Sequence, residues 1–272
     1  MKVLYCGDVV GRSGREVLKE RLPTLIEETK PDWVLVNGEN AAAGFGITKT
    51  ICKDFFDLGV DAITTGNHAF DQRAILSYFS EQKKLIRPLN YPAGTPGSGL
   101  CVLEKPSYSG RLIVVQVMGR LYMDPLDDPF ASLEKVLEQY SLKDPSINGI
   151  FVDIHAETTS EKMALAQAFD GRVSAVIGTH THIPTADHQI LRKGTAFQSD
   201  VGMCGDYDSV IGMEKEAPIE RFTKKFSRQR LTPASGEATL CAIWIEIDKT
   251  TGHAVRIDPI RLGGCLSKAY PF

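Results

Sequence analysis

Residues 173–182 read Val173-Ser174-Ala175-Val176-Ile177-Gly178-Thr179-His180-Thr181-His182. The first half of this segment is a short apolar run, and the second half is a polar cluster with two histidines two positions apart. A short apolar run bounded by glycine is typical of a strand that is buried on both faces. We therefore interpret Val173–Ile177 as a buried strand whose carboxyl end carries the histidine cluster.

The same arrangement recurs along most of the chain. Short apolar runs predict further strands at Lys2–Cys6, Trp33–Val36, Asp61–Thr64, Gly110–Val117 and Ile150–Asp153. Amphipathic patterns between them predict helices at Arg12–Glu28, Thr48–Leu58 (with Thr48 as N-cap), Asp71–Phe79, Pro129–Tyr140 and Ser160–Phe169. This alternation of buried strands and helices indicates an α/β protein built in layers.

The C-terminal part has a different pattern. Apolar and polar residues alternate over 241–248, a turn follows at Asp248–Gly252, and Ala254–Ile260 forms a return strand, which predicts an antiparallel hairpin. Leu85–Gly99 is rich in proline and glycine, and we expect it to be irregular. Thr223–Glu237 is the best candidate for a mobile loop; its basic residues, Lys224, Lys225, Arg228 and Arg230, belong either to a solvated surface, which we favour, or to a contact with an anionic partner. We find no repeat or linker, and we predict a single domain over 1–272.

Polar clusters follow five of the predicted strands. They are Gly7-Asp8, Asn37-Gly38-Glu39-Asn40, Thr65-Gly66-Asn67-His68, Asp153-Ile154-His155 and the segment 178–182. Four of the six histidines of the chain lie in these clusters, and only His188 and His253 lie elsewhere. Because ligands bind at the carboxyl ends of the strands in open α/β sheets, we expect these side chains to meet at one site.

The residue types suit a site for two metal ions. Imidazole nitrogen with carboxylate or amide oxygen is a donor set for Fe, Mn or Zn, and no cysteine lies in the clusters. Two cations roughly 3.5–4 Å apart need a bridging anion, and the Glu39 carboxylate can supply one oxygen to each. Taken singly, each motif has a structural interpretation: Gly66-Asn67-His68 as a helix-capping turn, His155 as a core histidine.

Composition excludes several classes of protein. The 272 residues are 43% hydrophobic and 24% charged, as in a folded globular protein, and the formal charge is -3, so stable binding to nucleic acid is not expected. The sequence has neither an apolar run of membrane-spanning length nor a signal-peptide core. The six cysteines are scattered, which indicates reduced side chains. We predict a cytoplasmic protein without a membrane partner; its oligomeric state is open, and a homo-oligomer is compatible with the sequence.

The clusters resemble the motifs of the calcineurin-like metallophosphoesterase superfamily. The resemblance rests on Gly7-Asp8, Gly66-Asn67-His68, His155 and Gly178-Thr179-His180-Thr181-His182. Two departures from the superfamily motifs are the pattern of the YmdB-like branch. Val9-Val10 follows Asp8, where the superfamily has Asp-x-His, and Asn37-Gly38-Glu39-Asn40 stands in place of Gly-Asp-x-x-Asp. Asp8–Arg12, Asp153–Lys162, His182–Asp187 and Asp200–Met203 also resemble that branch.

This resemblance implies a four-layer α/β/β/α sandwich with a binuclear centre. It implies that Asp8, Glu39, Asn40 and His182 hold one metal ion, and that Glu39, Asn67, His155 and His180 hold the other. Iron is implied at both positions, with manganese as a substitute. The implied substrates are small phosphodiesters, notably 2′,3′-cyclic nucleotides, with weaker monoesterase activity.

The mechanism that we expect is attack of a metal-bridging hydroxide on phosphorus, with His68 as the general acid. Asp71, three residues further on, is a candidate to orient His68. Two other functions are compatible with the same residues: a binuclear hydrolase of a non-phosphate bond, such as an amide, and a metal-containing regulatory protein that barely turns over.

Overall fold

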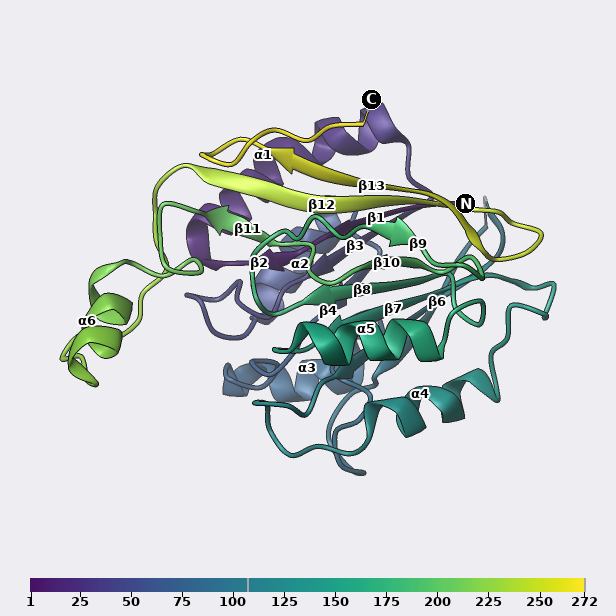
Figure 1. Cartoon of the computed structure of the whole chain (residues 1–272), viewed down its shortest axis with the longest axis horizontal. Helices are drawn as coiled ribbons and strands as arrows, with labels where there is room; N and C mark the ends of the chain where they lie inside the picture. The colour runs from purple at the N-terminus through teal and green to yellow at the C-terminus, as the bar shows by residue number, and fades with distance from the viewer. Residues whose placement is uncertain (107, 272) are drawn as a thin grey trace.

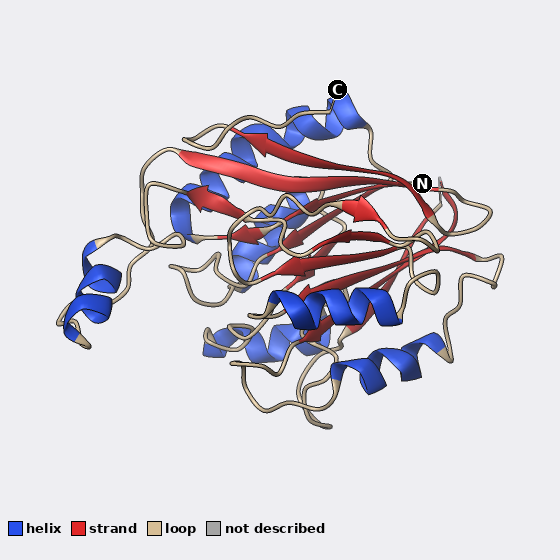
Figure 2. Cartoon of the chain, viewed as in Figure 1, coloured by secondary structure: helices blue, strands red, loops and turns tan. Residues whose placement is uncertain are grey.

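Two β-sheets lie face to face in the computed structural model, which describes residues 1–106 and 108–271 (Figure 1). Helices cover the outer faces of both sheets (Figure 2). This is the α/β/β/α arrangement that the sequence analysis predicted.

The first sheet has the strand order β2-β11-β12-β1-β3-β4 in the described part of the chain, and β13 pairs with β12. Strands β1, β3 and β4 are mutually parallel, whereas β12 is antiparallel to β1 and forms the predicted hairpin with β13. The strands are β1 (Lys2–Cys6), β2 (Asp8–Val9), β3 (Trp33–Asn37), β4 (Ala62–Thr64), β11 (Met203–Asp206), β12 (Ala238–Ile247) and β13 (Ala254–Leu262).

The second sheet has the order β5-β6-β7-β8-β10-β9. Its central strands β6, β7, β8 and β10 are parallel, and the edge strands β5 and β9 are antiparallel to their neighbours. The strands are β5 (Leu100–Lys105), β6 (Tyr108–Met118), β7 (Ile147–His155), β8 (Ala175–Thr179), β9 (Gln189–Ile190) and β10 (Ala196–Gln198). The sequence analysis missed β2, β5, β9, β10 and β11, most of which are too short to show an apolar period.

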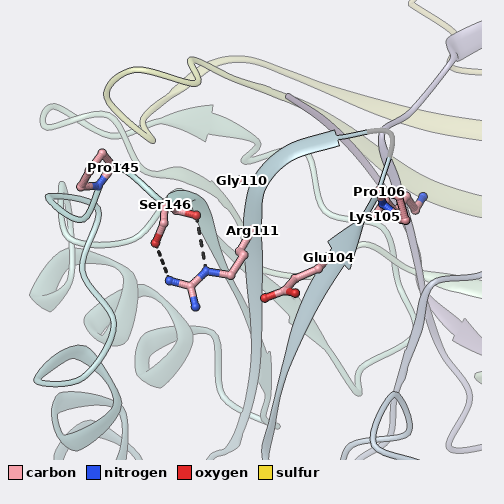
Figure 3. A pocket seen from close by; sticks show the side chains of 7 residues that line it. All are labelled: Glu104, Lys105, Pro106, Gly110, Arg111, Pro145 and Ser146. Atoms are coloured by element: carbon pink, nitrogen blue, oxygen red, sulfur yellow. Dashed lines mark hydrogen bonds between the residues drawn. The ribbon is translucent and has the colours of Figure 1, made fainter.

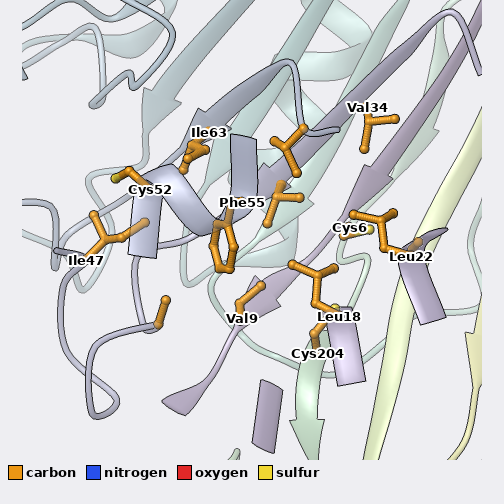
Figure 4. Packing of buried hydrophobic residues seen from close by; sticks show 14 of the residues in the cluster. Cys6, Val9, Leu18, Leu22, Val34, Ile47, Cys52, Phe55, Ile63 and Cys204 are labelled. Atoms are coloured by element: carbon orange, nitrogen blue, oxygen red, sulfur yellow. The ribbon is translucent and has the colours of Figure 1, made fainter. Parts of the chain in front are cut away.

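Three apolar layers hold the sheets and helices together. In β1, Leu4 and Cys6 face the helices of the first sheet, whereas Val3 and Tyr5 face the second sheet. Figure 4 shows the helix-side layer, in which Phe55 and Leu18 pack on the first sheet. A third layer lies between the second sheet and its helices. Burial on both faces explains why these strands are apolar without interruption.

The helices are α1 (Gly11–Thr29), α2 (Lys49–Asp57), α3 (Leu76–Glu81), α4 (Pro129–Leu137), α5 (Thr159–Ala168) and α6 (Glu216–Lys224). Thr48 is the N-cap of α2, as predicted, because its side chain accepts a hydrogen bond from the Ile51 amide. Among the described residues, no helix is both long and apolar enough to cross a membrane.

Two predicted segments are wrong in their bounds. The helix predicted over Asp71–Phe79 is a 3₁₀ turn at Arg73–Ile75 followed by α3, because Gln72 is extended and the Asp71 side chain bonds back to His68. The loop predicted over Thr223–Glu237 begins inside α6, which projects from the body of the molecule (Figure 1). Its four basic side chains are exposed, and its mobility stays a prediction. Leu85–Gly99 contains no helix or strand, as predicted.

Candidate metal centre

The structure brings the predicted site residues together where the two sheets meet. Glu39 follows β3, Asn67 and His68 follow β4, and Asp8 begins β2, all in the first sheet. His155 is the last residue of β7, and His180 and His182 follow β8, all in the second sheet. The carboxyl ends of parallel strands from both sheets therefore deliver side chains to one place.

Two overlapping groups of chelating atoms occupy this place. One group is Glu39, His155 and His180, and the other is Asp8, Glu39 and His182. Within each group, one ligand atom of every residue lies within 4.8 Å of the others. Glu39 belongs to both groups, as a bridging carboxylate would.

The amide of Asn67 also lies in the first group. Its Oδ1 is 3.0 Å from His155 Nε2, and the same nitrogen is 3.1 Å from a Glu39 carboxylate oxygen and 3.2 Å from His180 Nδ1. Four atoms that could ligate a metal ion thus lie close together at one point.

Two buried oxygens, one in the second group and one in the residue that follows Glu39, have no hydrogen-bond partner. They are Asp8 Oδ1 and Asn40 Oδ1. The other polar atom of each side chain is held: Asp8 Oδ2 accepts from the His180 amide, and Asn40 Nδ2 donates to the Gly44 carbonyl. Because an unpaired buried oxygen is costly, these two atoms fit metal ligands better than structural groups.

A hydrogen-bond chain sets the tautomer of His155. The Thr179 hydroxyl donates its proton to Asp153 at 2.7 Å, so it accepts from His155 Nδ1 at 2.8 Å. The proton of neutral His155 is therefore on Nδ1, and the Nε2 lone pair faces the other donors. Such outer partners orient metal-ligating histidines in many proteins. Asp153 is held in turn by Tyr5 and Gln116.

The other two histidines are oriented in the same manner. His182 Nδ1 lies 2.8 Å from the Ile211 carbonyl, which can only accept, so Nε2 is the free nitrogen. His180 Nε2 lies 3.0 Å from the Glu157 carboxylate, which leaves Nδ1 free. In its neutral form, each ring thus directs its unprotonated nitrogen toward the cluster.

The protonation equilibria of the cluster are strongly shifted. Burial raises the pKa of Asp8 to about 7, and burial with the nearby His155 lowers the pKa of His180 to about 3. Burial disfavours the charged forms of Glu39 and His155, but the attraction between the two charges is stronger than this effect. The pKa of His155 therefore rises to about 9, and the pKa of Glu39 falls to about 2. Without a metal ion, this pair is therefore ionised at neutral pH.

The loop with His180 and His182 has a costly backbone conformation. Both residues have positive φ values, 93° and 67°. The buried Asp200 carboxylate holds the loop, because it accepts hydrogen bonds from the amide and the hydroxyl of Thr181. Lys162, also buried, lies 3.0 Å from Asp200 and donates to the Thr179 carbonyl.

Sequence reasoning assigned no role to Lys162, Asp200, Glu157 or Thr179. The signal available was their place in the segments Asp153–Lys162, Gly178–His182 and Asp200–Met203, which resemble the family. Only the packing of these segments shows what the side chains touch.

A pocket of about 310 Å³ opens over the cluster. Its polar lining includes Glu39, Asn40, His180 and His182, and His68 lies in the wall. His68 Nδ1 is 2.8 Å from the Asp71 carboxylate, so the orienting contact expected for Asp71 is present. The His68 ring also packs edge-on against Phe45, with 5.1 Å between ring centroids.

A second hollow is lined by Glu104, Lys105, Arg111 and Ser146 (Figure 3). It lies where β6 and β7 begin, and His155 is at the opposite end of β7. In the described ranges, both groups of chelating residues reach the other pocket, which Glu39, His180 and His182 line.

Solved structures share this fold over the whole chain. A novel phosphatase from Mycoplasma pneumoniae is 33% identical, with a TM-score of 0.89, over 100% of this chain and 95% of that chain. A hypothetical protein from Thermus thermophilus is 42% identical, also with a TM-score of 0.89, over 97% of this chain and 100% of that chain. The fold is that of the metallophosphatases, and the chain is a phosphoesterase enzyme.

Within this class, the chain belongs to the YmdB-like protein family, whose model matches residues 4–260. The 2′,3′-cyclic-nucleotide 2′-phosphodiesterase of Bacillus subtilis (strain 168) is 44% identical over 260 residues, which cover 96% of each chain. A putative phosphatase/phosphodiesterase of Mycoplasma pneumoniae is 36% identical over 270 residues, 96% of this chain and 93% of its own. The family resemblance seen in the motifs is confirmed.

Proposed function

We propose that this protein is a metal-dependent phosphodiesterase that hydrolyses 2′,3′-cyclic nucleotides and, more weakly, phosphomonoesters. The observation that carries the proposal is the position of Glu39 in both groups of chelating atoms. The name of the Bacillus subtilis relative supports this choice of substrate. A cytoplasmic location stays a prediction, and the oligomeric state stays open.

The proposed ligands fall into two sets that share Glu39. Asp8, Asn40 and His182 complete one set, and Asn67, His155 and His180 complete the other. The two unpaired oxygens and the three free ring nitrogens support these sets. The donors are nitrogen and oxygen only, which suits iron, with manganese as a substitute. Two bound cations would supply Lewis-acid stabilisation of the phosphoryl oxygens and would acidify a water nucleophile.

His68 delivers the proton that the leaving oxygen needs. Its Nδ1 is engaged by Asp71, so Nε2 is the ring nitrogen that can donate to a substrate in the pocket. The same contact with Asp71 fixes the orientation of the His68 ring. Such proton donation is worth roughly 10²–10⁴-fold in rate.

The test compares His68→Ala with the unmodified enzyme on two substrates. The variant should lose roughly 10²–10⁴-fold in kcat on a 2′,3′-cyclic nucleotide, whose leaving alkoxide needs a proton. It should lose little on a p-nitrophenyl phosphodiester, because p-nitrophenolate leaves without one. Metal content should stay unchanged. Loss of metal with unaltered activity per bound metal would instead make His68 a ligand.

Metal dependence is tested on protein purified without added metal. Elemental analysis should find up to two metal ions per chain, and a chelator should abolish product release from cyclic nucleotides, diesters and monoesters. Full metal occupancy without turnover of any phosphate ester would contradict the proposal and support a regulatory protein or a hydrolase of another bond.

A further inference from the structure

The pocket over the metal centre has an apolar side as well as a polar one. Phe45, Ile211, Met213 and Leu231 line it beside the chelating residues. We call these four residues the apolar wall. The phosphate group of a substrate is charged and polar and would not bind to these apolar side chains. The natural occupant is therefore a part of the substrate beyond the phosphate.

Two chain segments build the apolar wall, and they contact each other. Phe45 lies in the loop after β3, and Met213 Cε approaches the backbone of that loop at Gly44. Met213 precedes α6 in the sequence, and Leu231 follows it. Backbone hydrogen bonds between residues 212–214 and 232–234 join the two segments that flank this helix. The wall is therefore braced on both sides.

Ile211 has an unusual conformation for an exposed apolar residue. Its side chain is 52% exposed, and its φ is 48°, a value that β-branched residues rarely adopt. The conformation places its carbonyl against His182 and its side chain at the pocket. Backbone strain of this kind is concentrated at binding and catalytic sites.

We infer that the apolar wall is the subsite for the nucleobase of the substrate, which it holds by stacking and apolar contact. This inference rests on the proposed function, which supplies a nucleotide as the substrate. The four side chains carry no hydrogen-bond donor, so the wall distinguishes bases by surface area and not by their polar edges. Purine nucleotides bind more tightly than pyrimidine nucleotides, and adenine and guanine are treated alike.

The experiment compares two cyclic phosphates that differ in the base alone. Adenosine 2′,3′-cyclic phosphate has the base, whereas the 2,3-cyclic phosphate of 1-O-methylribose has the same ring and phosphate without it. The wild-type KM should be lower for the nucleotide. Leu231→Ala and Met213→Ala should each raise the nucleotide KM by about tenfold, because they remove apolar contact, while the KM of the baseless substrate stays the same.

Phe222→Ala is the matched control. Phe222 is an apolar residue of α6 that is 89% exposed and lies outside the pocket, so its removal should change neither KM. If both substrates have equal KM values, or if the two wall variants affect them equally, the base subsite is wrong although the enzyme is a phosphodiesterase. A hundredfold preference between adenine and guanine would also contradict it. If the wild-type enzyme hydrolyses neither substrate, the proposed function itself fails.

Discussion

A carboxylate oxygen of Glu39 lies 3.1 Å from Nε2 of His155, and both side chains are almost completely buried. Glu39 follows a strand of the first sheet, and His155 ends a strand of the second. The contact therefore joins the two sheets at the candidate metal centre. A buried ion pair adds little net stability, because desolvation offsets its attraction, so this pair is better explained by metal binding.

Metal binding should release protons from the cluster. The neighbouring Glu39 carboxylate outweighs burial and raises the pKa of His155 to about 9, so the metal-free protein holds this proton at pH 7. A metal ion must displace it, and apparent affinity should rise with pH by up to about tenfold per unit until pH approaches 9. Calorimetric titration with Mn²⁺ in two buffers of different ionisation enthalpy measures the proton number. A proton number of zero at pH 7 would contradict the ionised pair.

Gly66→Ala should remove metal binding without a change in any ligand. A Cβ atom at Gly66 would overlap both Glu39 Oε2 and His155 Nε2, which belong to the two side chains that form the shared contact. Metal content and phosphodiesterase activity should fall together. Gly94→Ala is the control, because no atom lies near its Cβ position although its φ is 89°. It should cost about 1–2 kcal/mol of stability and keep the metal. Full metal content in Gly66→Ala would show that the cluster is placed elsewhere.

Lys162→Met should destabilise the protein strongly. The substitution leaves the Asp200 carboxylate buried without its partner, which costs about 3–5 kcal/mol in the free energy of unfolding. Urea unfolding of the metal-free protein measures this loss. The double variant Lys162→Met/Asp200→Asn should regain part of the loss, because no unpaired charge remains. A double variant less stable than either single variant would show that the two residues do not act as a pair.

Asp71→Asn should lower turnover less than His68→Ala does. The amide can still contact His68 Nδ1 but lacks the negative charge of the carboxylate and orients the ring less firmly, so we expect about a tenfold loss in kcat on cyclic nucleotides. The loss should vanish on a p-nitrophenyl diester, as for His68→Ala. Asp54→Asn, at an exposed position of α2, is the control. Equal losses on both substrates would mean that Asp71 supports structure and not proton transfer.

Sequence reasoning pointed to the candidate site because its residues follow strand ends. The apolar runs of β3, β7 and β8 are local signals, and their carboxyl ends carry Glu39, His155 and His180. Where the local signal was mixed, the prediction failed. The segment Asp71–Phe79 has a helical apolar pattern, but the contact between Asp71 and His68 keeps its start out of the helix.

The sequence by itself determined the α/β layering, the hairpin at the C-terminal end and the residue types that meet at the candidate metal centre. These follow from burial and from short-range patterns, which the order of residues contains. Only the tertiary structure decided which imidazole nitrogen is free, that Lys162 and Asp200 brace the histidine loop, and that an apolar wall adjoins the cluster. Each of these depends on how two sheets and distant loops pack against one another, and sequence spacing does not specify that packing.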